Sequence, residues 1–127
     1  LLLEIYSTDY DDRLPPANTW MDATFDYGKS DLIYSDPNIE GIKKSQYGYA
    51  FFRPLSGLRT QSISDPAEMP LTFESKDLSR NANGLLDLLP YRLKKHKGNN
   101  VSFLDYHAAV MPEEWRFNVI VVDLREP

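Results

Sequence analysis

The chain has 127 residues, the usual size of one domain, so we treat residues 1–127 as a single globular unit. Hydrophobic residues make up 42% of it and aromatic residues 13%, which is enough for one core and excludes a disordered protein. The net charge of −5 argues against nucleic acid as a partner, and the lack of cysteine excludes disulfides and zinc–thiolate sites.

The first ten residues have the pattern of the end of a helix. Apolar side chains crowd one side of this stretch, and the acids Asp9, Asp11 and Asp12 follow. Because acids at a helix C-terminus oppose the helix dipole, we place this cluster just beyond the helix. Leu14-Pro15-Pro16 then requires an extended path.

A second, shorter helix is expected before residue 30. Either Asn18 or Thr19 can cap its N-terminus, and Gly28 can end it. Ser35-Asp36-Pro37-Asn38 has the composition of a turn.

The rest of the chain alternates strand patterns with turns. Strands are expected at residues 47–53 and 71–74, in a hairpin at 101–103 and 108–110, and at 117–124, where apolar residues on both faces are typical of a central strand. Residues 76–100 form a long connection with one helical turn at 85–89. A helix at the front and several late strands predict an α+β fold with an antiparallel sheet.

One of the two histidines offers a candidate site. Asp105 and His107 would lie on one face of a strand, because successive residues alternate. A metal-dependent hydrolase would need His96 to join them, since two ligands are too few for a structural metal. The simpler interpretation is a hairpin aspartate beside a partly exposed histidine. No nucleophile elbow, phosphate-binding loop or zinc-protease signature is present, so we expect no enzyme.

A calcium loop is suggested by Asp36-x-Asn38-x-Glu40-Gly41. The EF-hand pattern requires a glutamate at its twelfth position, where this chain has Tyr47, so an EF-hand is excluded. A looser calcium site built from loop acids, including the 9–12 cluster, remains an alternative.

Two further stretches offer binding surfaces. Lys94-Lys95-His96-Lys97, with Arg92 before it, fits either an anionic partner or a solvated loop. Residues 47–52 carry four aromatic side chains that would line a groove in a ligand-binding cell-envelope module, where a glycan or peptide would bind. The alternative is a sheet face packed into the core.

Short motifs follow one another in a recognisable order along residues 3–111. They are Tyr10-Asp11-Asp12-Arg13-Leu14-Pro15-Pro16, Trp20-Met21-Asp22-Ala23, Tyr47-Gly48-Tyr49-Ala50-Phe51, Leu55-Ser56-Gly57, Leu71-Thr72-Phe73-Glu74-Ser75, and His96, Gly98, Asn99 and Asn100 leading to Asp105 and His107. This order resembles that of bacterial prepilin-like proteins, relatives of the type II secretion pseudopilins that carry a C-terminal His…Asp-Gly processing-associated domain.

The resemblance implies a pilin-like head, in which the first helix packs on an antiparallel sheet. It implies a non-catalytic subunit of a type IV pilus-like or type II secretion pseudopilus-like assembly, whose partners are other pilin or pseudopilin subunits. It further implies an apolar membrane helix before Leu1 and a head held in the cell envelope, outside the cytoplasmic membrane. The abrupt start on Leu1-Leu2-Leu3 fits such a chain.

Three departures from the family pattern affect what can be expected. Ser35-Asp36-Pro37 stands where the family usually has Cys-Pro, and one glycine beside Gly98 is missing. Tyr106 replaces the glycine that normally follows Asp105. Because tyrosine is strained at positive φ, we expect this turn to be rebuilt.

The resemblance also makes calcium the one cofactor to consider. Secretion pseudopilin heads often hold calcium in a loop near the C-terminal strands. In this chain the candidate ligands are Asp77, Asp87 and Asp105, with Asn81 and Asn83 nearby in sequence.

Overall fold

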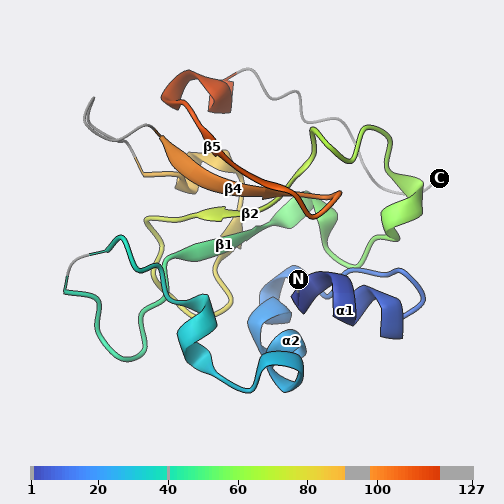
Figure 1. Ribbon diagram of the computed structural model, residues 1–127, viewed down its shortest axis with the longest axis horizontal. Helices are drawn as coiled ribbons and strands as arrows, with labels where there is room; N and C mark the ends of the chain where they lie inside the picture. The colour runs from blue at the N-terminus through green and yellow to red at the C-terminus, as the bar shows by residue number, and fades with distance from the viewer. Residues whose placement is uncertain (1, 40, 91–97, 118–127) are drawn as a thin grey trace.

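A computed structural model describes residues 2–39, 41–90 and 98–117. Helices α1 (Leu2–Asp9) and α2 (Trp20–Gly28) pack against each other and lie on one side of a five-stranded sheet (Figure 1). The α+β class predicted from the sequence is confirmed. Within the described ranges, no helix has the length and apolarity needed to cross a membrane.

The sheet has the strand order β3-β1-β2-β4-β5. Its strands are β1 (Tyr49–Phe52), β2 (Pro70–Glu74), β3 (Asn83–Gly84), β4 (Asn99–Phe103) and β5 (Ala108–Met111). Three neighbouring pairs are antiparallel, but β3 runs parallel to β1. The prediction of an antiparallel sheet is therefore corrected to a mixed one. The connection after β2 returns beside β1, where the Phe51 amide donates to the Ala82 carbonyl at 2.9 Å.

The predicted strands around β1 and β2 and the predicted β4–β5 hairpin are confirmed. The helical turn expected at 85–89 is the 3-10 helix Leu86–Leu88, whereas the two-residue β3 has no sequence signature. The strand expected at 117–124 begins on Phe117, which instead ends the 3-10 helix Glu113–Phe117. Residues 118–124 lie outside the described residues.

Helix α2 takes its N-terminal cap from a residue far along the chain. Thr19 makes no capping bond through its side chain. The Asn81 Oδ1 atom instead accepts the backbone N–H groups of Met21 at 2.8 Å and Asp22 at 3.2 Å. These amides have no partner within the helix, so Asn81 replaces the predicted local cap.

The residues beside Asn81 attach the same connection to α2. Arg80 donates to Asp22 at 2.5 Å and to Asp31 at 2.8 Å. The Trp20 indole N–H donates to the Ala82 carbonyl at 2.8 Å, and this bond is buried. The hydrogen bond from Arg80 is the main reason that the pKa of Asp22 lies below its usual value.

The core is built from large side chains on both helices and the sheet. Its fully buried members include Leu14, Met21, Phe51, Phe52, Leu55, Leu71, Phe73 and Val101. Aromatic contacts join the layers, because the Trp20 ring lies 6.2 Å from Phe51 and 5.8 Å from Tyr34, edge-on in the second case.

Candidate functional site

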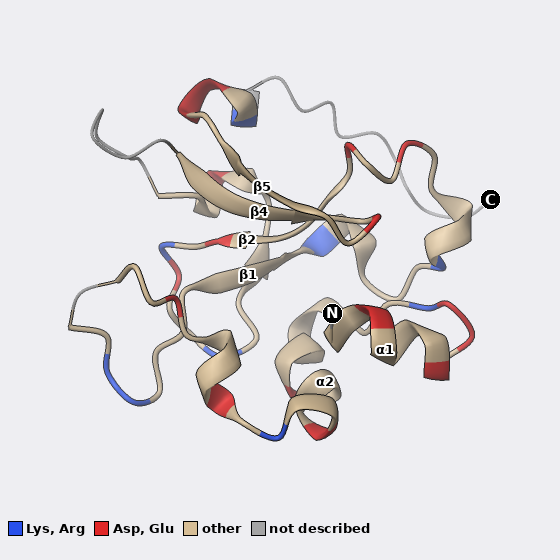
Figure 2. Ribbon diagram, viewed as in Figure 1, with Lys and Arg blue, Asp and Glu red and all other residues tan. Residues whose placement is uncertain are grey.

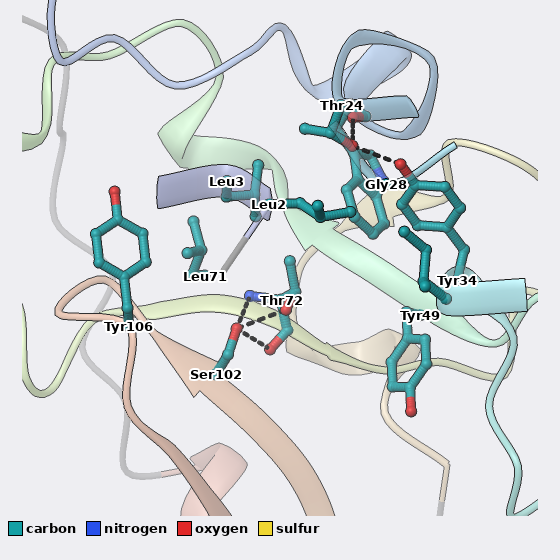
Figure 3. A pocket seen from close by; sticks show the side chains of 12 residues that line it. Leu2, Leu3, Thr24, Gly28, Tyr34, Tyr49, Leu71, Thr72, Ser102 and Tyr106 are labelled. Carbon is teal, nitrogen blue, oxygen red and sulfur yellow. Dashed lines mark hydrogen bonds between the residues drawn. The ribbon is translucent and has the colours of Figure 1, made fainter. Parts of the chain in front are cut away.

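A pocket of about 440 Å³ lies between the two helices and the sheet (Figure 3). Leu2 and Leu3 of α1 form one wall, and Leu71, Thr72 and Ser102 of the central strands form the floor. The volume falls within the range of small-ligand sites, about 300–1,000 Å³. The N-terminal end of α1 therefore borders an opening in the packing, rather than a filled interface.

The floor of the pocket carries a pair of hydroxyl groups. Thr72 of β2 and Ser102 of β4 are paired residues of neighbouring strands, so their side chains point to the same face. Their oxygens lie 2.5 Å apart, and the Thr72 amide also donates to the Ser102 hydroxyl at 3.2 Å (Figure 3).

The opposite wall is held by a buried hydrogen-bond network. The Tyr34 hydroxyl lies 2.7 Å from the Thr24 hydroxyl and donates to the Met21 carbonyl at 3.1 Å. Burial raises the pKa of Tyr34. Burial also raises the pKa of Tyr49 to about 12, with smaller contributions from the carboxylates of Asp36 and Glu74.

The pocket lining limits what chemistry the site can support. The described residues of this lining include hydroxyl groups but no carboxylate, ammonium, guanidinium or imidazole group. The three lining tyrosines, Tyr34, Tyr49 and Tyr106, have raised pKa values and stay protonated at neutral pH. The pocket therefore suits an uncharged apolar group, and the described part of its lining supplies no acid or base with a pKa near 7.

Tyr106 closes one end of the pocket from the turn between β4 and β5. Its amide donates to the Phe103 carbonyl at 2.8 Å, and the Phe103 amide donates to the His107 carbonyl at 2.9 Å. This is a three-residue hairpin loop in which Tyr106 takes the left-handed position with φ of 70°. The expectation of a rebuilt turn is therefore wrong, because tyrosine adopts the conformation that suits glycine.

Contacts with α1 hold Tyr106 in this strained conformation. The ring is half-buried at the pocket, and its hydroxyl lies 3.1 Å from that of Ser7. A left-handed non-glycine residue costs about 1–2 kcal/mol. Burial of an aromatic ring and one hydrogen bond together are sufficient to offset that cost. Burial also raises the pKa of Tyr106.

Asp105 and His107 meet as the simpler interpretation predicts, as a hairpin aspartate beside a partly exposed histidine. They lie in the turn rather than on a strand, and the Asp105 carboxylate contacts both the backbone amide and the Nδ1 of His107. This side-chain bond lowers the pKa of Asp105. The His107 ring stacks on Phe103 with 4.6 Å between centroids, and its side chain is 46% exposed. His96, the third member of the predicted cluster, lies outside the described residues.

The candidate calcium ligands are separate in the fold. Asp77 accepts hydrogen bonds from the amide and hydroxyl of Ser79, Asp87 is exposed in a 3-10 helix, and Asp105 lies in the β4–β5 turn. Among the described residues, no three His, Cys, Asp or Glu side chains are grouped to hold a metal ion.

The other loop acids also have individual roles. Asp9 accepts from the Tyr27 hydroxyl at 2.8 Å, Asp11 pairs with Arg59 at 3.0 Å, and Asp12 accepts from Gln61 at 2.7 Å. Asp36 is buried and caps its own turn, accepting the Asn38 amide at 2.9 Å.

The described part of the His96–His107 motif has a structural explanation. Gly98 has φ of 135°, and a Cβ there would lie 1.9 Å from the Met111 carbonyl oxygen, so only glycine fits. Asn99 is buried and donates to the Pro90 carbonyl at 2.8 Å. Asn100 is exposed, and its backbone amide donates to the Glu74 carboxylate at 2.5 Å.

The aromatic stretch belongs to the core rather than to a binding groove. Tyr47, Phe51 and Phe52 are buried, and only Tyr49 is half-buried at the pocket. A glycan or peptide groove along this strand therefore lacks the exposed rings that it needs. The basic residues from Arg92 to Lys97 lie outside the described residues.

Sequence reasoning missed most residues that form the pocket. Thr72 and Ser102 meet only because of the β2–β4 register, and Tyr34 reaches Thr24 from an irregular segment. Tyr106 was the one position with a signal, since a large aromatic residue stands where a turn favours glycine.

The fold and site define an α+β domain with an apolar pocket between its helices and a mixed sheet. Comparison with protein-family models, with curated proteins and with solved structures finds no match to this chain.

Proposed function

We propose that this chain is the head of a prepilin-like cell-envelope protein, acting as a non-catalytic structural subunit of a pilus-like or pseudopilus-like assembly. The observation that carries the proposal is the position of α1. Its Leu3 is buried in the core, its Tyr6 packs edge-on against Tyr27 of α2, and its N-terminal end borders the 440 Å³ pocket. A helix that continued before Leu1 would bring apolar side chains to this opening.

The order of the sequence motifs supports the same role. The left-handed turn at Tyr106 is the conformation that the family's Asp-Gly would take. Among the residues described at the pocket, none carries an ionisable group suited to proton transfer at neutral pH, which favours packing and partner contact over bond chemistry. In this proposal the preceding helix anchors the head in the membrane, and the head lies outside the cytoplasmic membrane.

The full-length gene product tests this proposal directly. We expect about 20 consecutive apolar residues before Leu1 and recovery of the protein in the membrane fraction. The matched control is the 127-residue chain, which should stay in the supernatant. A full-length product without such an apolar segment would contradict the proposal.

The pocket provides a second, independent measurement. Adding only the seven natural residues before Leu1 should raise the melting temperature, because their apolar side chains would fill the opening. A matched variant with serine at the apolar positions of this extension should show a much smaller increase. Equal melting temperatures for the two extended chains would mean that the pocket does not receive the helix.

A further inference from the structure

Strand β5 forms one edge of the described sheet, and its pairing with β4 determines which of its backbone N–H and C=O groups point outward. The Phe103 amide bonds to the His107 carbonyl, and Val101 is paired with Ala109 two residues further along. In an antiparallel ladder, alternate residues direct both backbone groups to the same neighbour. Ala109 therefore faces β4, whereas Ala108 and Val110 direct their N–H and C=O groups outward.

Nothing in the described residues pairs with these outward groups. The Ala108 side chain is exposed, and that of Val110 is 51% exposed. Figure 2 shows that β5 carries no charge between the single acid of the preceding turn and the acids of the following 3-10 helix. Natural sheet edges are usually protected by a charge, a proline or a bulge within the strand. At four residues this strand, Ala-Ala-Val-Met, is short, but it carries no charge, proline or bulge.

We propose that β5 pairs with β5 of a second copy of this chain, antiparallel about a two-fold axis at Ala109. This register places Ala108 of each copy opposite Val110 of the other. The two outward-facing residues then exchange both backbone bonds with each other, giving four hydrogen bonds by symmetry. Each exposed valine also covers a small alanine on the same face.

Self-complementarity is what selects a second copy as the occupant. The outward donors and acceptors of one strand match those of an identical strand turned by 180°, and neither strand carries a charge that opposes contact. The same register brings Asp105 towards Glu113 of the second copy. Because these like charges repel, pairing should strengthen when salt screens them.

The contact is small, so the pairing is weak in solution. Four residues per copy bury far less than the 1,200–2,000 Å² of a standard interface. We expect a dissociation constant of roughly 0.1–1 mM. The inference that β5 joins subunits rests on the proposed function. In such an assembly, a shared membrane or filament raises the local concentration of the chains.

Amide hydrogen exchange, measured by NMR, tests the pairing residue by residue. Between about 0.05 and 1 mM protein, exchange at Ala108 and Val110 should slow about two- to threefold, as expected for that range of affinity. Ala109 and Met111 should be protected equally at both concentrations, because they bond to β4. If exchange at Ala108 and Val110 does not depend on concentration, the proposal is overturned. Protection at both concentrations would mean that another part of the same chain covers the edge.

Single-residue variants test whether the concentration dependence comes from β5 itself or from exposed apolar surface in general. Val110→Lys should abolish the concentration dependence, because it places two ammonium groups in the paired edge. Leu85→Lys is the matched control, since Leu85 is 47% exposed and lies outside the sheet. If Val110→Lys does not fold, Ala108→Lys tests the same contact. Membrane anchoring through an upstream helix is unaffected by either change, so failure here leaves the proposed function standing.

Discussion

Tyr106 shows how one residue can keep an unfavourable backbone conformation. It occupies the left-handed position of a three-residue hairpin loop with φ of 70°. The strain persists because the ring is half-buried and its hydroxyl reaches Ser7 of α1. The side chain thereby ties the β4–β5 hairpin to the first helix, which a glycine could not do.

Two substitutions at this position separate backbone strain from side-chain packing. Both Tyr106→Ala and Tyr106→Gly lose the ring and should destabilise the fold. We expect the glycine variant to be about 1 kcal/mol more stable than the alanine variant, because only glycine tolerates this φ without strain. Urea unfolding of both variants measures the difference. An alanine variant at least as stable as the glycine variant would show that the turn relaxes once the ring is removed.

The N-terminal cap of helix α2 comes from Asn81, which lies 60 residues further along the chain than Met21. Asn81 accepts the amides of Met21 and Asp22, and its side-chain N–H donates to the Asp22 carboxylate at 2.8 Å. Asn81 itself has φ of 59°, a conformation that asparagine tolerates better than most residues. The short helix is therefore stabilised by the connection between β2 and β4.

Replacing Asn81 should weaken α2 more than replacing the local residue. Asn81→Gly keeps the backbone conformation but removes the cap, and we expect it to reduce the free energy of unfolding by about 1–2 kcal/mol. Thr19→Ala, as the matched control, should change stability by less than about 0.5 kcal/mol because Thr19 forms no side-chain cap bond. Chemical denaturation followed by circular dichroism measures both. A larger loss for Thr19→Ala would contradict the assignment of the cap.

At the scale of the whole molecule, burial of tyrosines makes stability sensitive to alkaline pH. Among the described residues, five tyrosines have raised pKa values in the folded chain, namely Tyr6, Tyr27, Tyr34, Tyr49 and Tyr106. For four of them the main cause is burial. For Tyr27, whose pKa is raised to about 12, it is the hydrogen bond to Asp9. Because these pKa values are higher in the folded chain, the tyrosines of the unfolded chain lose their protons first as the pH rises.

These tyrosines should therefore leave the free energy of unfolding unchanged well below pH 10 and reduce it as pH rises from 10 towards 12. Tyr49→Phe should remove roughly 1–2 kcal/mol of this decline, because its pKa of about 12 lies two units above the ordinary value. Urea unfolding at pH 9 and pH 11.5 measures both chains. A decline of the same size in the variant would show that Tyr49 ionises normally in the folded state.

The α+β class, the first helix, most of the strands and the turn that begins at Ser35 could be predicted from the sequence. These features depend on neighbouring residues, through hydrophobic periodicity and turn chemistry. Asp105 and His107 were also correctly expected to meet, although the contact is made by turn geometry rather than by strand alternation.

Other features were decided only by the tertiary structure. The α2 cap comes from Asn81, the parallel β3 comes from a returning connection, and the hydroxyl pair of Thr72 and Ser102 comes from strand register. Each joins residues that are distant in sequence, so no local pattern can indicate it. The sequence by itself determined which segments become helix and strand. Packing determined which of their side chains meet, because a contact between distant residues depends on the path of the chain between them.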